Sequence, residues 1–495
     1  GLKMPSNKKL LQAAAGSASS TEGYVEDVFS TFLYDGTGNS SYNSGDGSNQ
    51  NIVSGIDLSG EGGMVWTKSR NNGVRHSVVD TERGATKMLN TDETGAEVTT
   101  TDSTISFNSN GHTLGVDNGF QRVNFKGTVP YNYAAWSFRK APKFFDVVTY
   151  TGNGTAGRTI AHSLGSTPGM MIVKQTSGAY NWQIYHSGFG PTKFLEFNIG
   201  ATQTSSAVWN DTAPTDSVFT VGNEYGVNRS GYTYVAYLFA SDAGGYGDDG
   251  TENIIKCGGV TSSSGGLIDV TGLGFEPQWV LIKNSSASGG WTMFDIMRGM
   301  SNTGNTGTTA QGLFPNTSAF ESAAVCWPNA DGFFVNGSYI SGSNNSADFI
   351  YIAIRMSMKT PEAGTEVFNA ITRTGTGANA TITGLGFNPD EIISQTRGLT
   401  YGGIWFSRLR GGNQALYPPS TAAEYTSTNC VTEFSTNGYK LGTDGSNQIN
   451  SNTVTYVNWC FKRAAGFMDV VCWTGEPPNT NQRVSHNLTV APELI

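Results

Sequence analysis

The chain has 495 residues, of which only 14% are charged and 64 are glycine, and its formal net charge is −9. This composition is typical of short strands joined by polar turns, and it excludes a protein built from amphipathic helices. The acidic balance and the lack of a basic stripe argue against nucleic acid as the main partner. No run of about 18 apolar residues occurs, so the sequence predicts no membrane span.

Residues 1–24 are predicted to form an N-terminal arm. Lys8 to Ala15 could make one or two helical turns, and a linker of Ser, Gly and Thr follows them. The apolar part of this segment is too short and too polar for a secretory signal. Two interpretations stay open: an attachment arm that docks on a partner, or a disordered terminus.

One stretch recurs five times and organises the rest of the chain. A leucine is followed four residues later by proline, or by Gly62 in the first copy, and then by an apolar run. In the four complete copies a lysine or glutamine lies six residues beyond the proline or glycine. The leucines are Leu58, Leu164, Leu273, Leu385 and Leu488. Because the intervals between these leucines, 106, 109, 112 and 103 residues, are the size of whole domains, we expect each copy to build its own core.

The apolar run of this stretch predicts a strand that is buried on both faces. Met170 to Val173 and Trp279 to Ile282 are continuous apolar runs bounded by turn residues. The proline fixes φ and donates no hydrogen bond, so it suits the first residue of a strand. A buried helical turn is the weaker alternative because the runs are short and partly β-branched.

The predicted fold is all-β: four β-sandwich domains in tandem, with the start of a fifth. Each domain opens on an aromatic strand and closes on a Tyr-x-x-aromatic strand, with Ile354 the exception in the third. The predicted ranges are 25–143, 144–250, 251–363, 364–465 and, for the first strands of a truncated fifth repeat, 466–495. Short linkers favour a semi-rigid rod of stacked domains. We also expect the sequence to be the front part of a longer chain.

Asn-Gly pairs predict hairpins at two places in the array. Phe107 to Gly111 and Phe434 to Gly438 both carry Asn-Gly between apolar alternations, the strongest short hairpin signal. Asp331-Gly332 occupies a similar place in the third domain. The Gly-x-Gly fragments at 152–154 and 375–377 do not extend to a dinucleotide fingerprint, so they are predicted to be turns.

Two sets of residues could carry chemistry. Asp80 with Arg83, and Asp295 with Arg298, share an Asp-x-x-Arg-Gly frame, of which Ser407 to Gly411 is a variant; the second domain has Tyr185-His186 there. An arginine-based anion or sugar site is one interpretation, and a local turn in which the acid pairs with its own arginine is the favoured one.

Three tryptophans form the second set. They lie at comparable places after the buried strand, where they could contact carbohydrate or simply fill the core; they are Trp182, Trp291 and Trp405. We favour the core.

The remaining candidates point away from catalysis. Neither a nucleotide-binding motif nor a nucleophile motif occurs, and no pair of carboxylates recurs in a suggestive setting. His162 and His486 share one repeat position, which other residues fill in the other copies. The cysteines are odd in number and not closely paired, so buried thiols are expected rather than a disulfide framework; they are Cys257, Cys326, Cys430, Cys460 and Cys472. We predict no enzyme activity, no catalytic, cofactor-binding or metal residues, and no cofactor.

The repeats resemble those of a known group of proteins. The motifs are the Thr-Gly-Asn-Gly of residues 151–154, the Leu-Gly-x-x-Pro of the anchor stretch, the Tyr-Val-Ala-aromatic closing strand of residues 234–237, and the start at residues 7–16. They are similar to tail-fibre and virion-appendage proteins of marine bacteriophages, especially T7-like phages of cyanobacteria. This resemblance covers essentially the whole chain.

The resemblance implies a non-enzymatic structural role in host attachment and assembly as a homotrimer. In this interpretation the protein is an extracellular tail fibre of the virion. Residues 1–24 dock on the tail, the stacked domains form a stalk, and a distal part outside this sequence binds the host receptor. A capsid-attached fibre or knob is the first alternative. A secreted, multi-domain carbohydrate-binding or carbohydrate-active protein is a remoter one.

Overall fold

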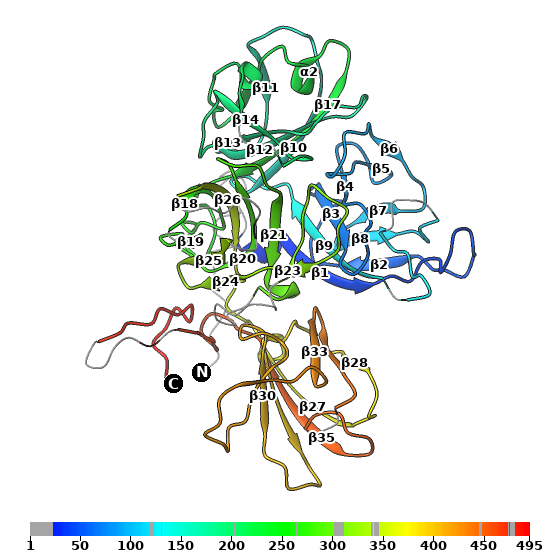
Figure 1. Cartoon of the computed structure of the whole chain (residues 1–495), viewed down its shortest axis with the longest axis vertical. Coiled ribbons are helices and arrows are strands. Elements are labelled where there is room, and N and C mark those ends of the chain that lie inside the picture. The colour runs from blue at the N-terminus through cyan, green and yellow to red at the C-terminus, as the bar shows by residue number, and fades with distance from the viewer. Residues whose placement is uncertain are drawn as a thin grey trace, which may run out of the picture.

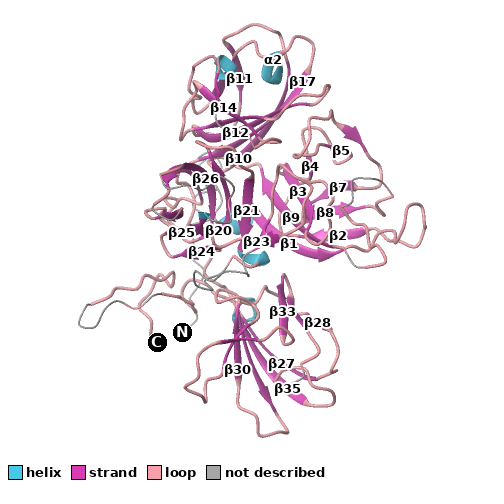
Figure 2. Ribbon diagram, in the orientation of Figure 1, coloured by secondary structure: helices cyan, strands magenta, loops and turns pink. Residues whose placement is uncertain are grey.

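The structure is a computed structural model. It describes residues 23–118, 123–129, 131–200, 204–263, 266–300, 311–337, 340, 346–444, 448–473, 475 and 481–495. Most of the predicted N-terminal arm therefore lies outside the described residues. The described chain is built from antiparallel strands, and its only α-helix is the four-residue α2 (Tyr225–Asn228) (Figures 1 and 2). The predicted all-β class is confirmed.

Four successive units share the same larger sheet. In each, the opening strand lies beside the closing strand, then the anchor strand that carries the repeated stretch, then a fourth strand. In chain order these are β1 (Phe29–Asp35), β9 (Asn132–Arg139), β3 (Gly63–Ser69) and β4 (Ser77–Asp80); β10 (Phe145–Thr151), β17 (Thr233–Ala240), β12 (Pro168–Gln175) and β13 (Gln183–His186); β18 (Ile255–Thr261), β26 (Asp348–Arg355), β20 (Pro277–Asn284) and β21 (Trp291–Asp295); β27 (Phe368–Thr374), β35 (Thr455–Phe461), β29 (Glu391–Thr396) and β30 (Ile404–Ser407). We call the units domains 1 to 4.

A smaller sheet packs on one face of each larger sheet, which makes each domain sandwich-like. The smaller sheets are β2 (Gln50–Val53), β8 (Gly111–Leu114) and β7 (Thr104–Asn108); β11 (Arg158–Ala161) and β16 (Val218–Val221); β19 (Leu267–Val270), β25 (Gly332–Asn336) and β24 (Cys326–Asn329); β28 (Ala380–Thr383), β34 (Gly438–Leu441) and β33 (Val431–Ser435). In domain 1, for example, Ile52 and Leu114 of the smaller sheet join Val65 and Tyr133 of the larger sheet in one core.

Short elements complete the described fold. Domains 2 and 4 extend their larger sheets with further strands, two extra strand pairs lie in domains 1 and 3, and four 3-10 helices interrupt the loops. These elements are β14 (Lys193–Glu196), β15 (Thr204–Ser205), β31 (Gln414–Leu416) and β32 (Tyr425–Thr426); β5 (Lys87–Met88) with β6 (Val98–Thr99) and β22 (Gln311–Gly312) with β23 (Ser322–Ala323); and η1 (Val25–Asp27), η2 (Ala207–Trp209), η3 (Ile296–Arg298) and η5 (Gly364–Glu366).

The predicted hairpins form between β7 and β8 and between β33 and β34, and a third forms between β24 and β25. Each second strand begins on a glycine, and a Cβ built on Gly111 would lie 1.9 Å from the carbonyl oxygen of Ile52 on the adjacent strand. The same holds at Gly438, where the distance to the Ile382 oxygen is 1.9 Å. Glycine is therefore required there by the close approach of the neighbouring backbone.

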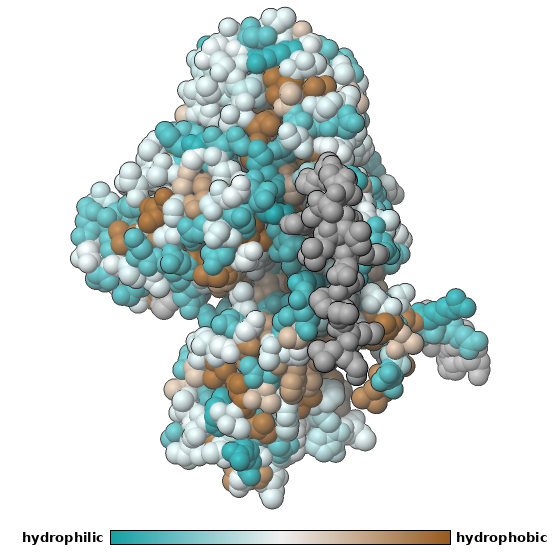
Figure 3. Space-filling view, turned by 180° about the vertical axis from the view of Figure 1, so that it is seen from behind, coloured by the Kyte–Doolittle hydropathy of each residue, from teal (hydrophilic) through white to brown (hydrophobic). Residues whose placement is uncertain are grey.

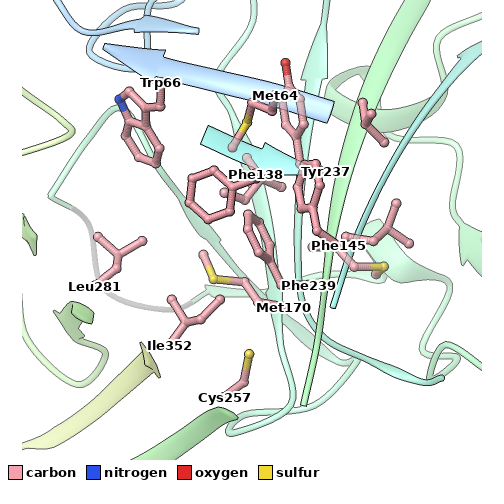
Figure 4. Packing of buried hydrophobic residues seen from close by; sticks show 14 of the residues in the cluster. Met64, Trp66, Phe138, Phe145, Met170, Tyr237, Phe239, Cys257, Leu281 and Ile352 are labelled. Atoms are coloured by element: carbon pink, nitrogen blue, oxygen red, sulfur yellow. The ribbon is translucent and has the colours of Figure 1, made fainter. Parts of the chain in front are cut away.

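Domains 1, 2 and 3 do not stack as the expected rod. Each larger sheet has its smaller sheet on one face, and its opposite face is directed toward the other two domains. Buried residues of all three domains belong to one hydrophobic cluster. Figure 4 shows this centre, where side chains of the three domains meet, among them Phe138, Phe239 and Leu281. We call the arrangement the three-domain ring, and the face of each larger sheet that turns away from its smaller sheet the ring face. Domain 4 lies below the ring in Figure 1.

The predicted first strands of a fifth repeat are not formed. None of the described residues of 466–495 lies in a strand. In domain 2 the equivalent strand, β10, pairs only with the closing strand β17. The described residues of this range form no closing strand either, so the backbone groups of residues 467–473 have no ladder to join.

Candidate functional site

Domain 1 meets domain 2 at the first Asp-x-x-Arg pair. The Nε atom of Arg83 donates to the Asp80 carboxylate at 2.6 Å, and both groups are buried. The hydroxyl of Tyr237, on the closing strand of domain 2, donates to the same carboxylate at 2.8 Å and accepts from Arg83 at 3.1 Å. Burial raises the pKa of Tyr237 well above its ordinary value, so this hydroxyl stays protonated and able to donate.

Domain 3 meets domain 1 in the same way. Arg298 Nε donates to Asp295 at 2.5 Å, and neither side chain is exposed. The indole Nε1 of Trp136, on the closing strand of domain 1, donates to Asp295 at 3.0 Å. The guanidinium carbon of Arg298 lies 5.3 Å from the centroid of the Trp136 ring, which adds a cation–π contact. Trp136 and Tyr237 are the last aromatic residues of the predicted closing-strand motif, so the repeat places them alike.

Domain 2 meets domain 3 without an acid–arginine pair. His186 occupies the position of the two aspartates, and its Nε2 lies 3.0 Å from the carbonyl oxygen of Tyr351 on the closing strand of domain 3. The backbone N–H of Gly188 donates to His186 Nδ1 at 3.0 Å, so Nδ1 is unprotonated and Nε2 carries the hydrogen. Desolvation lowers the pKa of His186 to about 4. In all three joints a residue at the end of the fourth strand of one domain contacts the closing strand of another, and together the joints close the ring.

The repeated frame explains the local turn. The backbone N–H of Arg83 donates to Asp80 and that of Arg298 to Asp295, each at 2.9 Å, so the aspartate caps the turn that its own arginine enters. The next residue is glycine, and Gly299 has a φ of 111°, a left-handed conformation that glycine tolerates best. The structure thus shows the local pairing favoured from the sequence. It adds an aromatic group from another domain, which a single repeat could not reveal.

Domain 4 keeps the arginine but not the acid. Arg410 donates to the carbonyl oxygen of Trp405 at 3.3 Å, as Arg83 does to Val78 and Arg298 to Met293. It also pairs with Glu424. Ser407 stands where domains 1 and 3 have aspartate. The turn is therefore built, but no closing strand of another domain is bound to it.

The lysines of the anchor strands have a structural role that the sequence analysis did not assign. Lys174 Nζ donates to the carbonyl oxygens of Gln175 at 2.6 Å and Thr94 at 3.1 Å. Lys68 and Lys283 bind backbone oxygens of the following turn in the same manner. Desolvation lowers the pKa of Lys174 to about 7. These ammonium groups satisfy buried carbonyls, and the recurrence of lysine or glutamine at this position was the signal available in the sequence.

The three candidate tryptophans divide into two groups. Trp182 and Trp291 are each 1% exposed and lie in the shared core, where both pack against Phe197, with ring centroids 6.4 and 4.9 Å away. Trp182 also donates across the joint to the carbonyl of Asn90 at 3.1 Å. The core interpretation is correct for these two. It is wrong for Trp405, which is 41% exposed and lies on the ring face of domain 4.

The two histidine candidates accept local backbone hydrogen bonds, and most of the cysteines are buried. The Nδ1 atom of His162 accepts from the N–H of Leu164 at 3.3 Å, and that of His486 accepts from Leu488 at 3.2 Å. All five cysteines are free thiols, and four of them are buried. Burial raises the pKa of Cys460 to about 12, which disfavours the reactive thiolate.

An open cavity lies where domains 1, 3 and 4 approach one another. Its volume is about 370 Å³, and its lining includes Arg70, Arg298 and Arg408. Each guanidinium already has a carboxylate partner: Glu321 and Glu433 pair with Arg70, Asp295 with Arg298, and Asp390 with Arg408. The cavity therefore presents no uncompensated positive charge to an anion.

Two further properties of the described residues bear on function. They contain no cluster of three or more His, Cys, Asp or Glu side chains placed to hold a metal ion. Nor does any helix in the described part of the chain have the length and hydrophobicity that crossing a bilayer requires.

Comparison with known proteins gives a family without an assigned activity. Neither a curated protein nor a solved structure matches the chain. A family described as a domain of unknown function (DUF7483) matches residues 27–323 and 363–495, which is most of the sequence. The first segment begins just before the opening strand of domain 1, and the second begins just before that of domain 4. The chain therefore belongs to the DUF7483 family.

Proposed function

We propose that this protein is a structural component of a bacteriophage virion, namely a tail fibre that serves host attachment. One observation supports a structural role: the recurrent polar groups are buried and bond the domains to one another. Asp80, Arg83, His186, Asp295 and Arg298, the residues best suited to chemistry, are buried and bound to one another or to the next domain. They hold domains together and offer no group to a substrate.

The virion location is supported by the repeat motifs. The anchor stretch, the closing strand and the residues 7–16 resemble those of phage tail-fibre and appendage proteins. In the proposed assembly, residues 1–24 dock on the tail and the chain forms a homotrimer. The shaft of such a fibre consists of three-domain rings and not of domains stacked singly. A distal part outside this sequence contacts the host surface receptor.

Immunogold labelling of intact virions tests this proposal. Antibodies raised against the 495-residue chain are expected to label the tail. Labelling of the capsid would favour a capsid-attached fibre, and absence of label from purified virions would contradict a virion role altogether. A second experiment deletes residues 1–24 and measures incorporation: the truncated protein should fold, as judged by circular dichroism, and should be lost from virions.

The oligomeric state is tested separately. Light scattering on the isolated chain, coupled to size exclusion, should give three times the 52.6 kDa mass of one chain. A monomer over the whole accessible concentration range would contradict the homotrimer and leave the virion location standing.

A further inference from the structure

The ring face of domain 4 is apolar and open. On domain 1 the ring-face residues Phe29 and Trp136 are 2% and 0% exposed, because domains 2 and 3 cover them. On domain 4 the corresponding Phe368 is 37% exposed and Trp459 is half-buried. Strand register fixes the correspondence, since Phe29 pairs with Phe138 as Phe368 pairs with Phe461.

The same face includes the anchor and fourth strands of domain 4. Trp405 pairs with Ile393 across β29 and β30, as Val78 pairs with Trp66 in domain 1. Trp405 is 41% exposed, whereas Val78 is 2% exposed. Figure 3 shows that hydrophobic residues gather on the surface of the lower body, which is domain 4. Exposed aromatic groups concentrated on one sheet face indicate an interaction site.

Domain 4 begins as domain 1 does. A 3-10 helix, η1 or η5, precedes the opening strand in both, and a buried valine follows it. The N–H of Val28 donates to Val25 at 3.1 Å, and that of Val367 donates to Gly364 at 3.2 Å. No 3-10 helix lies between β9 and β10 or between β17 and β18, where every residue is described. Domain 4 is therefore more like the first member of a ring than like the second or third.

The segment after domain 4 is folded as the segment after domain 1. In the segment after domain 1, Asp146 accepts from the N–H of Ser163 at 2.7 Å; in the segment after domain 4, Asp469 accepts from the N–H of Asn487 at 2.7 Å. After domain 1, the N–H of Lys143 also donates at 2.6 Å to the carbonyl of Leu164, which lies much later in the chain.

The segment after domain 4 contains the equivalent long-range hydrogen bond. Gly466 N–H donates to the carbonyl of Leu488 at 2.8 Å, and Phe467 N–H donates to Ala464 at 3.1 Å as Phe144 N–H donates to Ala141 at 3.2 Å. The segment after domain 4 thus begins as domain 2 begins, and it has the same position relative to domain 4 that domain 2 has relative to domain 1.

From these correspondences we infer that domain 4 is the first member of a second three-domain ring. Its ring face is the docking site for the repeat domain that opens at Phe467. In the first ring the incoming Phe144 and Phe145 lie against Phe138, with ring centroids 6.4 and 5.6 Å away. Phe467 and Met468 follow the same turn, since the N–H of Ala464 donates to the carbonyl of Met468 at 3.0 Å as that of Ala141 does to Phe145 at 2.9 Å. The occupant is a β-sandwich domain of the same repeat, and the inference holds whether or not the protein is part of a virion.

The arrangement of the first ring specifies the contacts. The fourth strand and turn of domain 4, with Trp405 and Arg410, should cover the closing strand of the domain that opens at Phe467. Trp459, which corresponds to Trp136, should in turn receive the fourth-strand turn of a third domain. Residues 470–473 line one cavity with Leu409 of the domain 4 turn. The same chain therefore already reaches this part of domain 4, which favours a partner in the same chain over a second copy.

Hydroxyl-radical footprinting with mass spectrometry tests the inference. The experiment compares the 495-residue chain with the protein that its gene encodes in full. Trp405 and Trp459 should be oxidised readily in the 495-residue chain and severalfold more slowly in the full protein. Tyr42 of domain 1, which is 71% exposed, is the control and should react equally in both. Equal oxidation of the two tryptophans in both proteins would overturn the inference, as would the absence of a complete repeat after Phe467.

A variant and a concentration series separate this partner from others. In the full protein, Trp459→Asp should raise the oxidation of Trp405 while Trp136 stays protected, because only the second ring opens. Unchanged oxidation of Trp405 would count against the docking. Protection of both tryptophans in the 495-residue chain that grows with its concentration would identify a second copy as the occupant and so overturn the proposal.

Discussion

The anchor strands of domains 1 and 4 have the same place in the same sheet but different surroundings. All seven residues of β3 are buried, whereas β29 alternates between buried and half-buried positions. The difference lies on one face only: the ring face of β3 is covered by two other domains, and that of β29 is not. In this family a continuous apolar run therefore indicates a strand with two covered faces: one packs against the smaller sheet, and the other packs against neighbouring domains.

The largest expected effect separates the two closing-strand tryptophans. Trp136→Ala should lower the free energy of unfolding by about 4 kcal/mol, because it opens a cavity in the shared core and leaves Asp295 without its indole donor. Trp459→Ala should cost about 1 kcal/mol or less in the 495-residue chain, since its face is open. Urea denaturation of both variants measures the difference. Equal losses would show that the two faces are equally covered.

The second effect concerns the buried ion pair of the joint. Asp295→Ala should destabilise the ring by about 3 kcal/mol, since it leaves the buried guanidinium of Arg298 with only the more distant Glu321 carboxylate, at 3.3 Å. Glu362→Ala removes a surface pair with Lys359 and is the matched control, with an expected loss of under about 0.5 kcal/mol. Thermal denaturation distinguishes them. A loss of similar size in both variants would contradict the role of Asp295 as a joint.

The third effect is a pH dependence centred on His186. Because its pKa in the folded chain is lowered to about 4, the unfolded chain binds a proton first, near pH 6.5. Stability should therefore be full above pH 6.5 and should fall by about 3 kcal/mol as the pH drops to 4 and below. His186→Gln should flatten this part of the curve. An acid limb of unchanged slope in the variant would assign the loss to other groups.

Domain 4 should show the opposite slope. Desolvation raises the pKa of Glu391 to about 7, so the folded chain holds this proton while the unfolded chain loses it near pH 4.5. Its contribution to stability is therefore present at low pH and is lost as the pH rises through 7. Glu391→Gln should remove the slope, and the change should appear only in the unfolding of domain 4.

The smallest effect tests the anchor-strand lysines. Lys174→Leu leaves the carbonyls of Gln175 and Thr94 without their donor and should cost about 2 kcal/mol. Lys174→Gln should cost under about 1 kcal/mol, because the fourth repeat uses Gln395 to donate to the carbonyl of Tyr401. Chemical denaturation again provides the readout. A glutamine variant as unstable as the leucine variant would show that charge, not donation, is what the position needs.

Sequence periodicity predicted the fold class well because its signals are local. The proline at the strand start, the apolar run and the glycines at 111 and 438 each depend on backbone geometry within a few residues, and the structure contains the strands and hairpins that they indicate. The linkers, by contrast, suggested a rod. Linker length sets how far apart two domains can lie, but the aromatic residues on the ring face of each domain determine how the domains pack.

The joints between domains could be predicted from the sequence only in part. The Asp-x-x-Arg-Gly frame signals a capped turn, and the acid does pair with its own arginine. The partner aromatic groups lie about 160 residues away in sequence, at Tyr237 for Asp80 and at Trp136 for Asp295, and no local pattern links them. Two signs in the sequence showed that domain 4 differs from domains 1 and 3: the loss of the acid at Ser407 and the glutamine, Gln395, in place of the anchor-strand lysine.

The central claim is that domains 1 to 3 share one core while domain 4 has its own. Differential scanning calorimetry of the 495-residue chain tests it most directly. The account predicts two transitions, one for domain 4 and a larger one for the ring, and Trp136→Ala should move only the larger. Four transitions of similar enthalpy, with only one of them shifted by Trp136→Ala, would mean that the domains unfold independently and would contradict the ring.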